Sequence, residues 1–144
     1  MGRRMINETL EIDNTNYTLY DLATKAYASV RFPTIIINSS TTSKESTLRL
    51  NTTGRPVFAI CTGSIYPTGT AWIRISLYRD GTLLRTQIVQ GNATDAHNPF
   101  SLSLLDSVPR GLHQYKIVFT RGGGDLYIGS NTGVGSPVFS VFEV

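Results

Sequence analysis

The sequence holds few of the residues that redox and metal chemistry need. Among its 144 residues there are one cysteine and two histidines. A single cysteine excludes an internal disulfide. Cys61 follows the apolar run Val57–Ile60, which predicts a buried, small hydrophobic residue at this position. His97 and His113 lack the spacing of a shared metal ligand pair, so we predict no metal site.

Charge is also sparse. Charged residues make up 16% of the chain and the formal net charge is +3. The largest basic group, Arg3-Arg4, is too small to indicate nucleic-acid binding. No stretch approaches the ~18 apolar residues of a transmembrane helix, and no apolar segment follows the two arginines as it would in a signal peptide. We therefore expect neither a nucleic acid nor a membrane among the partners.

No catalytic motif is recognisable in the sequence. There is no G-x-S-x-G elbow for a nucleophilic serine, and the ten acidic residues supply no obvious carboxylate pair of the glycosidase kind. The run Gly122–Gly124 joins two predicted strands and no helix follows it, which favours a hairpin tip over a phosphate-binding loop. We therefore predict that the protein is not an enzyme, has no catalytic residue and binds no cofactor.

The clearest pattern present is a long β-hairpin over Trp72–Val89. Its centre, Asp80-Gly81, suits a two-residue type I′ turn, since both residues tolerate positive φ values. Counting outward from this turn places one set of alternating residues on a core face. The cross-strand pairs predicted on that face are Leu77–Leu84, Ile75–Thr86 and Ile73–Ile88.

The chain downstream of Pro33 alternates polar and apolar residues with period two, separated by turn-rich pieces. Short strands at roughly 10-residue spacing predict an all-β protein, an antiparallel jelly roll or β-sandwich. The predicted strands are Ile35–Asn38, Thr47–Asn51, Pro56–Thr62, Ala71–Arg79, Thr82–Gln90, Phe100–Leu105, Leu112–Arg121, Asp125–Gly129 and Pro137–Val144.

The N-terminal part has a different character. Met1–Tyr17 is polar and weakly periodic, which predicts an extended arm. Thr18 is a candidate helix N-cap, and apolar residues follow at helical spacing up to Tyr27, so we predict one short helix before Pro33. The domains expected are an attachment segment over 1–33 and a β jelly roll over 34–144.

Aromatic residues allow two interpretations. They could form a platform on which sugars stack, or they could line the core edge and a subunit interface, where aromatic residues are enriched. The second interpretation is favoured. The residues concerned are Tyr66, Trp72, Tyr78, Tyr115 and Tyr127.

Four segments together resemble a known family. They are Gly54–Ala59 (GRPVFA), Tyr78–Gly81 (YRDG), Leu105–Tyr115 (LDSVPRGLHQY) and the terminal Pro137–Glu143 (PVFSVFE). Over residues 50 to 144, the order of strands, turns and aromatic residues resembles the TNF/C1q-like jelly rolls of small bacteriophage virion proteins. These include head-decoration and head-fibre proteins and the trimeric knobs of tail fibres and needles.

The resemblance implies a structural protein of the virion, assembled in the host cytoplasm, that forms a homotrimer and decorates or cements a capsid or builds a head fibre. The N-terminal arm would attach it to the major capsid protein or another virion protein. The candidate arm residues are Arg3, Arg4, Ile6, Leu10, Ile12 and Tyr17. The candidate three-fold contacts, which equally could fill the sandwich, are Tyr115, Ile117, Phe119, Phe139 and Phe142.

The alternative function is a tail-fibre or tail-needle tip that binds a glycan or receptor on the host surface. In that case the loops Tyr66–Gly69 and Gly91–Pro99 would carry recognition, because loops on a rigid sandwich commonly do.

Overall fold

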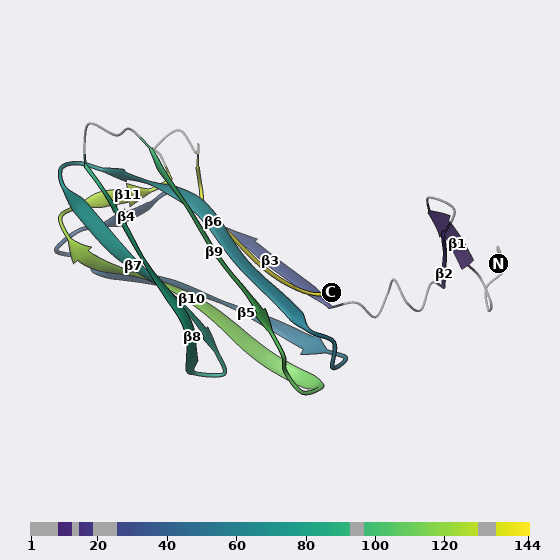
Figure 1. Cartoon of the computed structure of the whole chain (residues 1–144). Coiled ribbons are helices and arrows are strands. Elements are labelled where there is room, and N and C mark those ends of the chain that lie inside the picture. The colour runs from purple at the N-terminus through teal and green to yellow at the C-terminus, as the bar shows by residue number, and fades with distance from the viewer. Residues whose placement is uncertain (1–8, 13–14, 19–25, 93–96, 130–134) are drawn as a thin grey trace.

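The computed structural model describes residues 9–12, 15–18, 26–92, 97–129 and 135–144, and within these ranges the chain forms strands and no helix (Figure 1). No helix in the described part could therefore cross a membrane. The strands are β1 Thr9–Ile12, β2 Thr15–Thr18, β3 Tyr27–Arg31, β4 Ile35–Ile37, β5 Ser43–Thr52, β6 Val57–Pro67, β7 Ala71–Arg79, β8 Thr82–Gly91, β9 Asn98–Asp106, β10 Gly111–Gly123, β11 Leu126–Ile128 and β12 Val138–Glu143.

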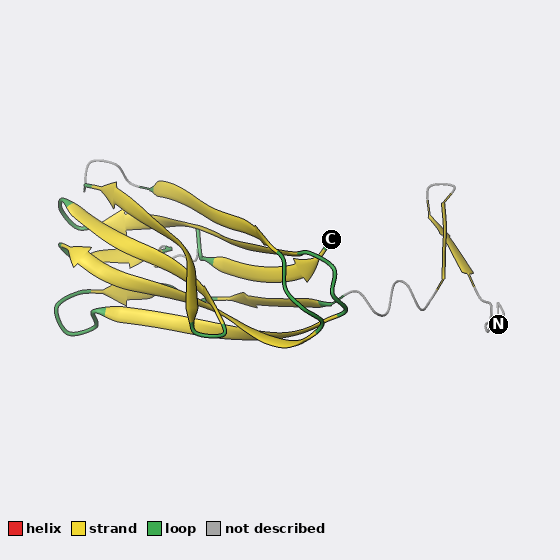
Figure 2. Ribbon diagram, turned by 60° about the horizontal axis from the view of Figure 1, so that its bottom comes forward, coloured by secondary structure: helices red, strands yellow, loops and turns green. Residues whose placement is uncertain are grey.

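Two antiparallel sheets pack face to face as a β-sandwich (Figure 2). One sheet has the order β5-β10-β7-β8. The other has the order β3-β12-β6-β11-β4, and β9 runs along the free side of β6. Strands β12 and β11 pair with successive parts of β6, and β3 and β4 pair with β12 and β11 in turn. With β9 on the other side of β6, this second sheet is four strands wide along its length.

The connections give the sandwich its jelly-roll character. From β4 to β11 the chain passes from one sheet to the other at every connection except the β7–β8 hairpin. Strand neighbours are therefore mostly distant in sequence, as in a double-sheet jelly roll. The predicted all-β sandwich is confirmed.

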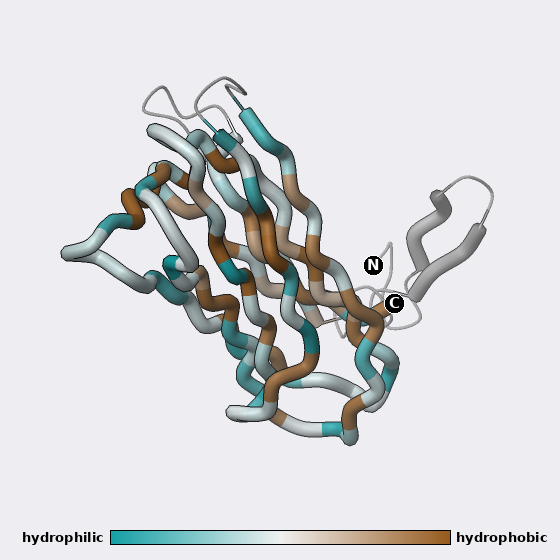
Figure 3. Tube along the Cα trace, turned by 60° about the vertical axis from the view of Figure 1, so that its left-hand side comes forward, coloured by the Kyte–Doolittle hydropathy of each residue, from teal (hydrophilic) through white to brown (hydrophobic). Residues whose placement is uncertain are grey.

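The core lies between the sheets and is filled by alternate residues of the sandwich strands, and hydrophobic segments recur along these strands in Figure 3. This period-two pattern is the one used to predict the strands. Cys61 is 1% exposed, as predicted, and burial raises the pKa of its thiol to about 12. The largest fully buried side chains are Tyr115, Phe119, Phe139, Ile37, Ile65, Ile73, Ile75, Leu77, Ile117, Leu126, Ile128 and Val57.

The β7–β8 hairpin confirms the predicted turn and corrects the predicted register. Asp80 and Gly81 both have positive φ, 49° and 83°. Beyond the first pairs the register shifts by one residue at a β-bulge, so Ile73 lies opposite Val89 rather than Ile88. A one-residue shift exchanges the two faces of a strand. Val89 is consequently buried, and Ile88 is 56% exposed.

The N-terminal helix is not supported. Thr18 ends strand β2 and Tyr27 begins strand β3, while the residues between them, 19–25, lie outside the described part. Strand β3 pairs with β12, and Phe32 is buried in the core, so part of the segment assigned to the N-terminal region belongs to the sandwich. Most of the residues that predicted the helix thus lie outside the described part of the chain.

Strands β1 and β2 form a separate two-stranded sheet. Leu10 pairs with Tyr17, and Ile12 with Thr15. The polar arm predicted over Met1–Tyr17 is therefore a hairpin where it is described. The remaining candidate arm residues, which lie outside the described part, are Arg3, Arg4 and Ile6.

Candidate interaction surfaces

Four of the five candidate trimer contacts lie inside a single subunit. These four residues are 0% exposed, because β10 and β12 are central strands whose inner sides face the opposite sheet. They fill the sandwich and offer no surface to another subunit. The four are Tyr115, Ile117, Phe119 and Phe139. The fifth, Phe142, points to the other side of β12 and is half-buried.

Phe142 belongs to the outer face of the second sheet, which we call the β6 face. It is built from alternate residues of four paired strands, so its members form three rows across the sheet. The first row is Tyr27, Phe142, Phe58 and Leu105; the second is Ser29, Ser140, Ile60 and Ser103; the third is Arg31, Val138, Thr62 and Ser101.

The first row of the β6 face is apolar and open to solvent. The ring of Phe142 lies 5.6 Å from that of Phe58 and 6.4 Å from that of Tyr27, measured between centroids. Cross-strand aromatic pairs of this kind stabilise a sheet. The two ends of the row are nevertheless exposed, Tyr27 at 68% and Leu105 at 59%. Of the twelve residues of the β6 face, Arg31 alone carries a charge.

The outer face of the opposite sheet, which we call the β7 face, is charged. It carries Glu45, Arg49, Arg74 and Lys116 on strands β5, β7 and β10. Arg74 lies 5.9 Å above the ring of Trp72, and Lys116 lies 5.0 Å above that of Tyr78. Such cation–π contacts are common on solvated surfaces. The two outer faces therefore differ sharply in charge.

This arrangement separates the aromatic residues of the predicted sugar platform. Trp72 and Tyr78 lie on the β7 face, whereas Tyr66 and Tyr127 pair with each other on the opposite sheet. Tyr115 is buried. The five residues do not form one platform.

The two segments predicted to carry recognition are joined by one contact between described residues, Tyr66 at the end of β6 and His97 just before β9. The ring of His97 packs edge-on against Tyr66, with 5.3 Å between the ring centroids. Tyr66 is 38% exposed, and His97 is exposed.

A buried polar cluster, which the sequence reasoning did not identify, lies where β7, β9 and β10 come together. Asp106 accepts a hydrogen bond from Arg79 Nε at 2.8 Å and another from Tyr115 Oη at 2.8 Å. Burial, followed by the hydrogen bond to Asp106, raises the pKa of Tyr115. Asp106 lies on β9 of the second sheet, whereas Arg79 and Tyr115 lie on strands of the first, so the cluster joins the two sheets.

Next to this cluster, His113 joins the β7–β8 turn to the loop before β10. Its Nδ1 lies 2.7 Å from Asp80 Oδ2, and its Nε2 lies 2.7 Å from the carbonyl oxygen of Pro109. Both neighbours are acceptors, so the ring satisfies both only when it is protonated. The hydrogen bond to Asp80 and then that to Pro109 raise the pKa of His113, and the same contact with His113 lowers the pKa of Asp80. The segments Tyr78–Gly81 and Leu105–Tyr115 together supply both clusters.

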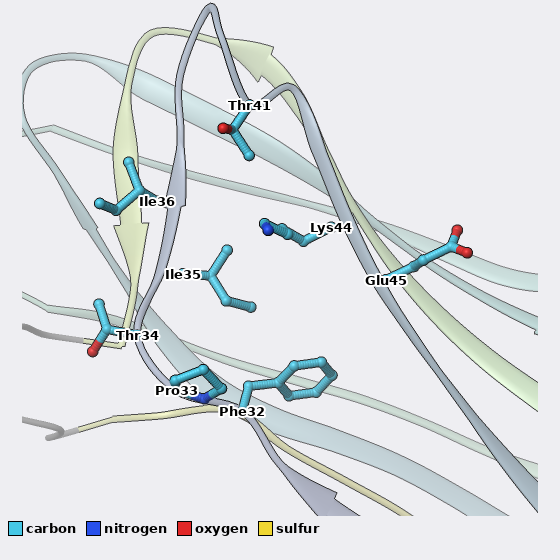
Figure 4. Close-up of a pocket in the computed structure, with 8 residues that line it drawn as sticks. All are labelled: Phe32, Pro33, Thr34, Ile35, Ile36, Thr41, Lys44 and Glu45. Carbon is cyan, nitrogen blue, oxygen red and sulfur yellow. The ribbon is translucent and has the colours of Figure 1, made fainter.

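A hollow of about 450 Å³ opens at the sandwich edge between β4 and β5 (Figure 4). Its lining residues are Phe32, Pro33, Thr34, Ile35, Ile36, Thr41, Lys44 and Glu45. Across the described part of the chain, no group of three or more His, Cys, Asp or Glu residues could hold a metal ion.

Comparisons with known proteins assign the chain to no family. No known family and no curated protein matches the sequence. Among solved structures, the crystal structure of dimeric latent PorU from Porphyromonas gingivalis is similar at a TM-score of 0.49 and 10% sequence identity. The match covers 71% of this chain and 10% of the PorU chain.

Proposed function

We propose that the chain is a structural virion protein of a bacteriophage, a TNF/C1q-like jelly roll that forms a homotrimer and decorates or cements a capsid or builds a head fibre. It acts by burying surface. The observation that carries this proposal is the contrast between the two outer faces of the sandwich, one almost free of charge and the other charged.

The β6 face has the composition of a subunit contact. Interface cores are depleted in charged residues and enriched in aromatic ones, and contiguous exposed apolar patches mark interaction sites. Tyr27, Phe58, Phe142 and Leu105 form such a patch beside serine and threonine residues. Identical copies of a chain with net charge +3 repel one another wherever their charged faces meet. An uncharged face avoids that repulsion, which favours a second copy of this chain as the partner.

The N-terminal hairpin supports an attachment role. Within the described residues, strands β1 and β2 pair only with each other. A lone two-stranded sheet is marginally stable in water, so the hairpin gains stability by docking on a larger assembly. We propose the major capsid protein or another virion protein as that assembly.

The oligomer is tested by the native mass of the full chain and of two matched variants. Leu105→Glu places a charge on the β6 face, while Leu112→Glu places one on the β7 face at a position 65% exposed. We expect a trimer for the unchanged chain and for Leu112→Glu, and a monomer for Leu105→Glu. A monomeric unchanged chain at micromolar concentration, or equal behaviour of the two variants, would contradict the proposal.

The attachment role is tested by deleting residues 1–17. We expect the shortened chain to keep its β-sheet circular dichroism and its trimer mass, and to lose binding to particles that lack the protein. If the shortened chain still binds these particles, the arm is not the segment that attaches the protein to them.

The second candidate is a tail-fibre or needle tip that binds a host-surface glycan or receptor. The contact between Tyr66 and His97 favours it, because it joins the two segments predicted to carry recognition. Loss of host-cell binding on Tyr66→Ala, with particle attachment intact in the deletion variant, would support this function over the first.

A further inference from the structure

The hollow between β4 and β5 arises from a break in the edge of the second sheet. Strand β3 pairs with β12, and β4 pairs with β11, but Phe32–Thr34 steps from one to the other. Pro33 has no N–H group and cannot continue a ladder. The first residues of strand β5, which belongs to the opposite sheet, lie across from this break. The course of the backbone therefore sets the gap between the edge of the second sheet and the start of β5.

The floor of the hollow is apolar and packed against the core. Phe32 is 8% exposed and Ile35 is 5% exposed, and the ring of Phe32 is held edge-on by Phe119 at 5.6 Å between centroids. Ile36, on the rim, is 49% exposed. A volume of about 450 Å³ lies within the range of small-molecule sites.

One cation faces this apolar floor. In Figure 4 the side chain of Lys44 extends over the hollow between Thr41 and Ile35, whereas Glu45 points away from it. Glu45 lies 3.9 Å from Lys116. Within the described residues Lys44 has no acidic partner. Thr41 engages Asn38 through its backbone N–H and carbonyl oxygen, which leaves its hydroxyl at the rim.

We propose that this hollow binds a small amphipathic carboxylate, such as a single-chain fatty acid. The hydrocarbon chain lies on Phe32 and Ile35, and the carboxylate pairs with the ammonium group of Lys44. An apolar floor with a single unpaired cation matches a ligand with an apolar body and one negative end. This inference is independent of the proposed oligomer, because the hollow lies at the sandwich edge.

Decanoate is the probe. We expect titration into the full chain, followed by ¹³C-edited NMR, to shift the methyl signals of Ile35 and Thr41, with saturation at millimolar concentration. Lys44→Glu should weaken binding about tenfold or more. Arg49→Glu, which changes the net charge equally on the outer face of the same strand, should leave it unchanged.

Two further measurements complete the test. Decyltrimethylammonium, with a similar chain and the opposite charge, should bind at least about tenfold more weakly than decanoate. Thr41→Phe, which fills the hollow without touching the backbone hydrogen bonds to Asn38, should remove decanoate binding while the remaining NMR spectrum is kept. Equal binding of the two amphiphiles, equal effects of the two charge reversals, or no shift at Ile35 would overturn the proposal.

Discussion

Tyr115 donates its phenolic proton to Asp106 across 2.8 Å, with the tyrosine side chain 0% exposed. Tyr115→Phe removes this donor and keeps the ring. We expect a loss of about 1–2 kcal/mol in the free energy of unfolding, because Asp106 keeps its bond to Arg79. Asp106→Ala should cost more, about 3 kcal/mol, because it leaves Arg79 and the Tyr115 hydroxyl without their acceptor. Urea denaturation of the three proteins gives both values, and equal losses would show that the cluster does not act as a unit.

The sequence predicted the sheets better than it predicted the surfaces. Alternation along Phe100–Leu105 and Leu112–Arg121 correctly identified strands with one buried side. It could not distinguish an inner side that packs on the opposite sheet from an outer side that packs on another subunit, since both are apolar. Tyr115 and Phe119 were assigned to two alternatives for this reason, and the structure places them in the core.

The hairpin shows the same limit at the level of register. Asp80-Gly81 fixed the turn, because few pairs accept two positive φ values. The bulge that places Leu77 opposite Arg85 has no local sequence signal. With Arg85 in this register, its Nη1 donates to the carbonyl oxygen of Ser103 in the other sheet at 2.9 Å. The Asp106 cluster could not be predicted, because Arg79 and Asp106 are 27 residues apart and meet only when the two sheets pack. The residues that line the hollow at Lys44 are close in sequence, but its shape depends on the spacing between two sheet edges, which alternation along a strand does not define.

The imidazole of His113 makes stability depend on pH near neutrality. Its folded-state pKa is raised by Asp80 and the Pro109 carbonyl. Its contribution to the free energy of unfolding is therefore fully present below the unfolded pKa of about 6.5 and is lost as pH rises through the folded pKa. We expect the melting temperature of the unchanged chain to fall over this window. His113→Gln should lose this dependence.

Asp80→Asn provides the matched control for His113. It keeps an acceptor for the Gln114 N–H and removes the negative charge. We expect NMR titration to give His113 a lower pKa in this variant than in the unchanged chain. An unaltered His113 titration would mean that Asp80 is not the group that holds the imidazolium.

Glu143 anchors the chain by hydrogen bonds at the point where the N-terminal segment enters the sandwich. Its carboxylate accepts the backbone N–H of Thr53 at 2.6 Å and of Ala26 at 3.1 Å, and the hydroxyl of Thr53 at 2.9 Å. Burial alone would raise the pKa of this carboxyl, but these donors outweigh it and the pKa is lowered. The contribution of Glu143 to the free energy of unfolding is therefore present above its ordinary pKa near 4.5 and is lost as pH falls through the lowered pKa.

We expect Glu143→Gln to cost about 1–3 kcal/mol at neutral pH, because the amide nitrogen cannot accept the hydrogen bonds of the carboxylate oxygen that it replaces. It should also speed hydrogen exchange of the Tyr27–Arg31 amides, since β3 then loses its anchor at Ala26. Exchange measured by mass spectrometry on both proteins checks this. Faster exchange throughout the sandwich, rather than in β3 first, would argue against a local anchor.

The ring of Trp72 packs closely against Gly122 and Gly123, and a Cβ atom added at Gly122 would stand 2.0 Å from the indole ring. No such contact is tolerated, so Gly122→Ala must displace the ring. We expect a loss of about 1–3 kcal/mol and a red shift in the emission of the sole tryptophan as it becomes more hydrated. Gly69→Ala is the matched control, because a Cβ there meets nothing within 4 Å, and it should change stability by less than about 0.5 kcal/mol. If Gly122→Ala leaves both the emission and the urea midpoint unchanged, the ring does not rest on these glycines, and their run serves only as a flexible connection between β10 and β11.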